Sequence, residues 1–294
     1  MQKNNSLHES SYRFSTSIRI IVVFLVSSLA VLTALGVLPL AKLMGVNPSH
    51  LQGISFQPTF KTMTVVLLYS ASQFLLILLV MRFIHRKKVL SLGFNRPFWK
   101  PFLIGSAIGI GLAVAELSID ALIGGNISMK WAVPADVSVI SVIGHFLLWL
   151  LFLLTLNSLK EELVFRAYPI ELFNDHPQAF IWIIIFISLL FAAIHHIIEP
   201  FSLSAFLSRF SIAIVFAYTY YRWRSIWLIV GIHNGTNFIG FLFGGMWKSG
   251  GLFEFEFTSP SSEIIISVDL AVKLLALALI HYVWKKANMR KING

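Results

Sequence analysis

Eight long apolar segments recur along this chain, and they constrain its fold more than any other feature. They cover residues 18–40, 62–84, 101–123, 137–159, 179–197, 203–221, 226–243 and 264–284. A helix needs about 20 mostly apolar residues to cross a bilayer. The segments lack the alternation of membrane strands and are too long for them, so a barrel is excluded. The sequence therefore predicts an all-α fold, a polytopic membrane helical bundle of about eight transmembrane helices.

Composition and charge agree with a membrane protein. Hydrophobic residues make up 57% of the chain and charged residues 12%, which excludes a soluble domain of this length. The net charge of +10 does not indicate nucleic acid, because the basic residues lie between the apolar segments. With the amino terminus inside, cytoplasmic segments hold 17 of the 23 basic residues, including Lys160 and Arg166. Both termini are then expected in the cytoplasm, and the lipid bilayer is the expected partner.

The expected domain organisation is one membrane domain between two short tails. Residues 1–17 are predicted as a cytoplasmic tail, 18–284 as the transmembrane domain and 285–294 as a second cytoplasmic tail. The first apolar segment is too long for the core of a signal peptide. The chain has no cysteine, so disulfides, thiol catalysis and cysteine-bound metal are excluded.

The acidic pair Glu161-Glu162 lies at the end of the fourth apolar segment, after Lys160. Ionised groups in or beside a bilayer are costly and often mark function. Glu162 and Arg166 are four residues apart, so they can pair and support the helix end. Neighbouring helical residues point about 100° apart, so Glu161 faces elsewhere, on the side of Asn157. Glu161 is therefore the carboxylate left available for chemistry.

Two later apolar segments place histidines at the same spacing. Phe191 and His195 are four residues apart in the fifth segment, and His233 and Asn237 repeat that spacing in the seventh. A lone membrane histidine more often bonds a neighbouring helix than catalyses a reaction. Polar groups on three helices, one of them a glutamate, favour a shared site.

These side chains suit hydrolysis by an activated water. A carboxylate hydrogen-bonded to a histidine can take a proton from water as it attacks a carbonyl. A second histidine and an amide can then donate hydrogen bonds to the oxyanion. Alternatively, Glu161, His195 and His233 could bind zinc with an open fourth position, so the cofactor is either zinc or none.

The three motifs together resemble the CPBP family of intramembrane proteases. Glu161-Glu162 with Arg166, Phe191 with His195, and His233 with Asn237 match its pattern over residues 137–243. The family includes CAAX prenyl endopeptidases and bacteriocin-processing and immunity proteins. The resemblance implies that Glu161 and His195 activate water, that His233 and Asn237 stabilise the oxyanion, and that Glu162 and Arg166 support the site.

The expected function is thus an intramembrane endopeptidase of the bacterial plasma membrane. Its partner would be a peptide or membrane-protein substrate, such as a pheromone or bacteriocin precursor. The alternatives are a non-catalytic membrane scaffold or bacteriocin-immunity protein, and a proton-coupled transporter, since buried carboxylates and histidines suit that class too.

The predicted boundaries conflict with the proposed site at one point. Glu161 follows the end of the segment 137–159, whereas His195 lies deep in the segment 179–197, so the two would sit at different depths. Either the fourth helix continues beyond residue 159, or the fifth helix begins later than residue 179.

Several other residues have a structural interpretation and a functional one. Gly105, Gly109 and Gly111 are expected to allow close helix packing. Glu116 and Asp120 could line a hydrated path or face the bundle interior. His196 and Glu199 are expected to form a local pair, and His145 and His281 are expected to take part in packing. The basic run 86–88 is expected to be a topology anchor rather than a lipid site. The aromatic loop 244–262 is expected to be a connector rather than a lid.

Overall fold

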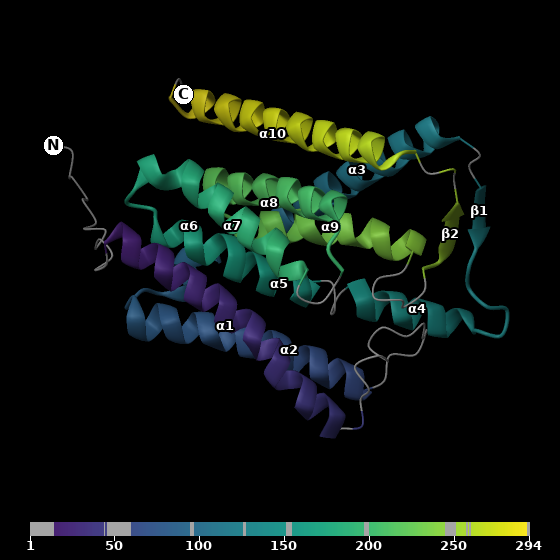
Figure 1. Cartoon of the computed structure of the whole chain (residues 1–294), viewed down its shortest axis with the longest axis horizontal. Helices are drawn as coiled ribbons and strands as arrows, with labels where there is room; N and C mark the ends of the chain where they lie inside the picture. Colours follow the sequence, from purple (N-terminus) through teal and green to yellow (C-terminus); the bar gives the residue numbers. More distant parts are fainter. Residues whose placement is uncertain are drawn as a thin grey trace.

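The computed structural model is a bundle of long helices (Figure 1). It describes residues 15–43, 45, 60–94, 97–125, 128–150, 155–196, 200–244, 251–256, 258 and 260–292. The helix α10 runs along one side of the bundle and α1 and α2 along the opposite side. The predicted helical membrane bundle is confirmed, and this is a multi-pass membrane protein.

The described helices and strands follow one another in a simple order. The first part contains α1 (Thr16–Leu43), α2 (Phe60–Leu79) with the π turn η2 (Val80–Ile84), η3 (Val89–Leu92), α3 (Trp99–Gly124), β1 (Ser128–Trp131) and α4 (Val139–Leu148). The second part contains α5 (Thr155–Glu162), the π turn η5 (Leu163–Ala167), α6 (Tyr168–Leu172), η6 (Pro177–Ala179), α7 (Phe180–His195), α8 (Leu203–Trp223), α9 (Ile226–Gly244), β2 (Phe253–Glu256) and α10 (Ser262–Ile292).

Seven helices in the described part of the chain are long and apolar enough to cross a membrane. They correspond to seven of the eight predicted segments. The predicted helix over 137–159 is described in two parts, because residues 151–154 lie outside the description. α4 ends at Leu148, and a second helical stretch begins at Thr155 and continues through α5, η5 and α6 to Leu172.

This helical stretch resolves the conflict over depth. It extends well past residue 159, while α7 begins at Phe180, close to its predicted start. The first alternative is therefore correct. The charges at Lys160 and Arg166 did not end the helix because the protein buries them, at 4% and 1% exposure. A buried charge with partners inside the bundle need not mark the edge of the membrane.

The π turn lies directly after the acidic pair. Pro169 has no N–H and cannot continue the regular α-helical hydrogen bonding. The preceding Tyr168 N–H instead bonds to the Leu163 carbonyl, five residues back. Such a turn widens the helix locally and re-aims the side chains on either side of it. This local irregularity separates the acidic pair from the end of α6.

The helical stretch from α5 to α6 lies in the main core of the protein. Its residues Val164 and Ala167 are fully buried. They belong to one cluster with side chains of α1, α2, α7, α8 and α9, including Val26, Ile77 and Ile229. The acidic pair is thus carried by a helix that other helices surround.

Glycines bring α3 and α9 into direct backbone contact. A Cβ atom added at Gly109 would lie 2.0 Å from the Ile232 carbonyl oxygen, and one at Gly105 2.2 Å from that of Leu228. From the other side, a Cβ at Gly235 would meet the Ser106 oxygen at 2.3 Å. The predicted packing role is correct for Gly105 and Gly109. It is wrong for Gly111, where an added Cβ would meet open space.

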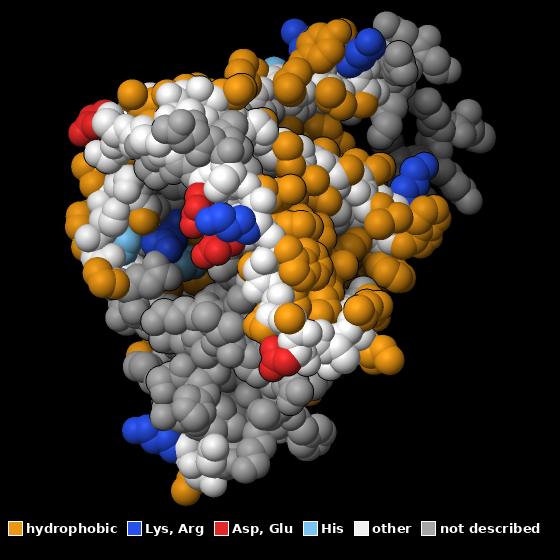
Figure 2. Space-filling view, turned by 90° about the vertical axis from the view of Figure 1, so that its right-hand side faces the viewer, with side chains coloured by type: hydrophobic (Ala, Val, Ile, Leu, Met, Phe, Trp, Pro, Cys, Tyr) orange, Lys and Arg blue, Asp and Glu red, His pale blue; other side chains and the backbone are white. Residues whose placement is uncertain are grey.

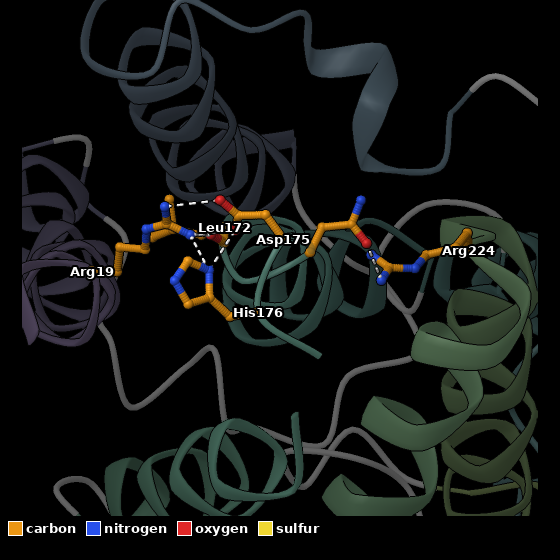
Figure 3. A network of polar contacts seen from close by, with 6 residues as sticks. Arg19, Leu172, Asp175, His176 and Arg224 are labelled. Carbon is orange, nitrogen blue, oxygen red and sulfur yellow. Dashed lines mark hydrogen bonds and ion pairs between the residues drawn. The ribbon is translucent and has the colours of Figure 1, made fainter. Parts of the chain in front are cut away.

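Arg19 attaches α1 to the turn that follows α6 (Figure 3). Its side chain is buried and donates to the Leu172 carbonyl at 3.0 Å and to both carboxylate oxygens of Asp175. Partial burial raises the pKa of Asp175, but hydrogen bonds from Arg19 and His176 outweigh it and hold that pKa well below its usual range. Arg19 therefore joins α1 to the turn after α6, which is distant in the sequence.

The two strands form a small antiparallel pair at one end of the bundle. β1 pairs with β2, with Lys130 and Glu256 in a salt bridge at 3.1 Å and Trp131 against Phe253. Figure 2 shows this end, where hydrophobic side chains cover much of the described surface and charged ones gather in small groups. Part of the predicted aromatic connector is thus ordered as a strand.

The two predicted tails are only partly within the described residues. α1 begins at Thr16, and residues 1–14 fall outside the description. At the other end, α10 continues to Ile292, so most of the predicted tail 285–294 is helical.

Candidate active site

The two neighbouring glutamates of α5 lie in different environments. The Glu162 side chain is fully buried, whereas 17% of the Glu161 side chain is exposed. This difference follows from the angle of about 100° between neighbouring helical residues. Glu162 faces the core and Glu161 faces a more open side.

Glu162 is held by two cationic or polar partners. Arg166 donates to Glu162 Oε1 at 3.2 Å, which is the pair that the sequence predicts. His233 of α9 donates from Nδ1 to the same oxygen at 2.7 Å. The Arg166 guanidinium lies 3.9 Å from the centre of the Phe191 ring, and Phe216 stacks on the His233 ring. Glu162 therefore fixes the position of one candidate catalytic histidine.

Glu161 lies beside the other nitrogen of the same histidine. Its Oε1 accepts a hydrogen bond from Asn157 at 2.8 Å, one helical turn earlier. Its Oε2 lies 3.8 Å from His233 Nε2, which is too long for a direct hydrogen bond. A water beside this gap can contact both groups. Glu161 and His233 can thus hold a reacting water between them.

His195 of α7 is oriented by its own helix. Its Nδ1 donates to the Phe191 carbonyl at 2.8 Å, and its ring lies edge-on to the Phe191 ring. A carbonyl only accepts, so Nδ1 carries a proton and the lone pair of the neutral ring is on Nε2. His195 lies within electrostatic range of Glu161.

Asn237 is half-buried and lies one turn after His233, on the same side of α9. The neighbouring Asn234 was not among the predicted site residues. It is buried and donates to Thr155 Oγ1 at 3.2 Å, and so joins α9 to the start of α5. Asn234 directly follows His233 and points about 100° away from it, so the spacing of four residues that indicated Asn237 did not indicate Asn234.

Lys160 and Tyr69 are further neighbours of Glu161 that the sequence analysis missed. Lys160 was expected among the orienting cytoplasmic charges, but its Nζ lies 3.8 Å over the Tyr69 ring of α2. Both groups interact electrostatically with Glu161. Tyr69 and Gln73 are four residues apart in an apolar helix, the same spacing that revealed the histidine motifs. That pattern could have indicated this face of α2.

The described residues do not form a compact cluster of metal ligands. Within the described ranges, no group of three His, Cys, Asp or Glu side chains comes together closely enough to hold a metal ion. In the zinc set of Glu161, His195 and His233, the Nδ1 atoms bond to Glu162 and to the Phe191 carbonyl, so only the Nε2 atoms of the two histidines could ligate a metal.

Other polar residues have local partners away from this site. Glu116 lies 3.7 Å from Lys273 of α10, and Lys273 also pairs with Asp269, which favours the bundle-interior interpretation for Glu116. His145 is buried among aromatic rings of α4 and α9, as expected. His281 contacts Tyr218 at 2.5 Å. The expected pair of His196 with Glu199 involves a residue outside the description.

Comparison with protein families gives one match. Residues 143–239 match a family described as Rce1-like, type II CAAX prenyl endopeptidase Rce1-like. No curated protein and no solved structure matches the chain. The matched stretch begins within α4 and ends within α9, so it contains the acidic pair and both histidine motifs. Residues 143–239 are therefore similar to the Rce1-like family of CAAX-type proteases, the CPBP group that the motifs resemble.

Proposed function

We propose that this protein is an intramembrane endopeptidase in which Glu161 activates a water molecule. The observation that carries the proposal is the position of the Glu161 carboxylate, 3.8 Å from an imidazole that Glu162 holds in place. A carboxylate that is neither tied to an arginine nor fully buried can accept a proton and return it.

The proposed reaction needs no covalent intermediate. A water beside Glu161 attacks the peptide carbonyl carbon while Glu161 takes its proton, and a new C–O bond forms. In this proposal His233 carries a proton on each ring nitrogen. It donates one hydrogen bond through Nδ1 to Glu162 and one through Nε2 to the oxyanion. The Asn237 amide is the second donor to the oxyanion. Glu161 then passes its proton to the leaving nitrogen as the C–N bond breaks.

His195 has a supporting part in this proposal. Its Nδ1 is occupied by the Phe191 carbonyl, so Nε2 can accept a hydrogen bond from the attacking water. Phe191 sets the orientation of this ring and also covers the Arg166 guanidinium. Glu162 and Arg166 act as positioning residues through His233.

The proposed substrate is a peptide or membrane-associated protein in the plasma membrane of a bacterium. The Rce1-like family supports a peptide bond as the target. The membrane setting of the site supports a substrate that reaches it from the bilayer.

The test is a comparison of membrane and secreted peptides from cells that produce wild type or Glu161→Gln protein. We expect cleavage products to fall by about 10²–10⁴-fold in the variant, the usual contribution of a general base. Glu254→Gln, an exposed carboxylate on β2, is the matched control and should cleave as wild type. Equal product levels in wild type and Glu161→Gln would contradict the mechanism and support the scaffold alternative.

A further inference from the structure

A second candidate site lies at the opposite part of the bundle from the β pair. A cavity of about 210 Å³ is bounded by the turn after α6, the end of α8 and α10. Its lining includes Phe173, Asn174, Tyr221, Arg222, Arg224 and Trp284. This volume is below the roughly 300–1,000 Å³ of pockets for drug-sized ligands, so it suits a small group or a headgroup.

The two arginines at this cavity differ in their partners. Arg224 donates to Asn174 at 2.6 Å and pairs with Glu171 at 3.4 Å. Arg222 forms no ion pair with a carboxylate among the described residues, and its buried Nε has no hydrogen-bond acceptor there. A buried donor without a protein acceptor can be completed by a ligand, an ion or a water molecule. One uncompensated positive charge therefore faces the cavity.

Aromatic rings hold the Arg222 guanidinium in place. It lies 4.1 Å from the centre of the Trp284 ring, 4.9 Å from that of Tyr218 and 5.2 Å from that of Tyr221. Stacking of this kind keeps a guanidinium ordered while its N–H groups point to the side. An ordered guanidinium beside an empty volume is suited to a planar two-point contact with phosphate oxygens.

The cavity lies where phospholipid headgroups are expected. The membrane span formed by α8 ends at Trp223, and the span that contains α7 begins at Pro177. The lining residues therefore lie at the ends of membrane spans. Tyr and Trp are enriched at this level of a bilayer. Two further basic residues, Lys285 and Lys286, directly follow Trp284 in α10. Basic pockets between spans bind acidic headgroups by this chemistry.

We propose that this cavity binds the phosphate group of an anionic phospholipid, with Arg222 as its principal contact. The same phosphate chemistry could be supplied by a soluble phosphate, which the test below separates from a lipid. This inference does not depend on the protease proposal, because no residue of the cavity belongs to the candidate active site.

The experiment uses the full-length protein in a neutral detergent. Binding of phosphatidylglycerol, phosphatidylcholine and inorganic phosphate is followed by native mass spectrometry and by the shift in thermal unfolding. We expect saturable binding of phosphatidylglycerol to wild type and weaker binding of phosphatidylcholine. Arg222→Gln should weaken it by at least about fivefold, since a basic residue at a membrane surface contributes roughly that factor.

The matched control is Lys88→Gln, which removes an exposed positive charge outside the cavity. It should bind phosphatidylglycerol as wild type does. Arg222→Lys keeps the charge without the planar fork and should show intermediate binding. It also serves as the deciding variant if Arg222→Gln does not fold.

The outcomes separate the alternatives. Binding of phosphatidylglycerol that inorganic phosphate does not compete for assigns the site to a lipid. Effective competition by inorganic phosphate assigns it to soluble phosphate. Equal binding of phosphatidylglycerol by wild type, Lys88→Gln and the folded Arg222 variants overturns the proposal.

Discussion

At the scale of single residues, the division of labour between Glu161 and Glu162 follows from helix geometry. Two adjacent carboxylates on a helix cannot face the same site in the same way. The buried one pairs with Arg166 and His233, and the more exposed one is left beside the second nitrogen of His233. The two residues should therefore respond differently to the same substitution.

We predict that Glu162→Gln loses stability and that Glu161→Gln does not. Removing Glu162 leaves the buried Arg166 charge uncompensated, which typically costs about 3–5 kcal/mol. Glu161→Gln leaves the Glu162–Arg166 pair intact and should change the free energy of unfolding by less than about 1 kcal/mol, since it removes no buried ion pair. Thermal unfolding in detergent measures both effects.

Both variants should be poor proteases, so stability is the readout that separates them. The double variant Glu162→Gln with Arg166→Met removes both partners and should recover part of the loss. Unfolding of Glu162→Gln at the wild-type temperature would show that the pair does not stabilise the bundle.

At the scale of elements, the contact between α3 and α9 decides where His233 lies. Because the glycines have no side chain, the backbones of the two helices lie in direct contact. Backbone atoms cannot move aside as a flexible side chain can, so this contact fixes α9 rigidly. The catalytic proposal therefore depends on residues of α3 that carry no functional group.

Gly109→Val should destabilise the protein, whereas Gly111→Val should not. A Cβ at Gly109 would lie 2.0 Å from a backbone oxygen, while one at Gly111 meets nothing within 4 Å. Overpacking costs about 1–3 kcal/mol and sometimes more. Thermal unfolding and folded yield compare the two variants of the same helix. Equal stability of both would mean that α3 and α9 do not approach so closely.

A second element-level contact joins the end of α2 to α6 and should depend on pH. His85 Nε2 and the Tyr168 hydroxyl lie 2.9 Å apart. Burial, with the positive charges of Lys87 and Arg19, lowers the pKa of His85 from 6.5 to about 4. The folded protein thus disfavours a proton that the unfolded chain accepts, so stability is lost as pH falls from about 6.5 towards 4.

Thermal unfolding between pH 7.5 and 5 tests this dependence. Wild type should lose more stability over this range than His85→Gln, which has no proton to take up. Other groups titrate in the same range, so the difference between the two proteins is the relevant quantity. Parallel curves would contradict the burial of a neutral His85.

At the scale of the whole molecule, membrane orientation is the main expectation still to be tested. The ends of α2 and α10 lie on the side of the bundle where α1 begins, and the β pair lies on the other side (Figure 1). Lys88 follows the π turn at the end of α2, and Lys286 lies in the last part of α10. Most basic residues are expected to be cytoplasmic, so the β pair should be outside.

Single cysteines can test this orientation because the chain has none of its own. In intact cells, Lys130→Cys on β1 should react with a membrane-impermeant maleimide. Lys88→Cys and Lys286→Cys should react only after the membrane is opened. All three side chains are exposed, so access to the reagent is limited by the membrane alone. The reverse pattern would place both termini outside.

Much of the fold was predictable from the sequence because the bilayer imposes it. Runs of about 20 apolar residues can satisfy their backbone in lipid only as helices. The pairing of Glu162 with Arg166 was also predictable, since a spacing of four residues places two side chains on one helical face. These features depend on neighbours in the sequence.

Other features were decided by contacts between distant parts of the chain. The helix carrying Glu161 continues to Leu172 because helices on several sides bury its charges, which no local pattern records. The same holds for Lys160 over Tyr69 and for His233 against Glu162. The sequence by itself thus determined a helical membrane bundle with acid, imidazole and amide groups on three helices. Only tertiary packing decided which nitrogen faces which carboxylate, because those distances are set by how the helices pack.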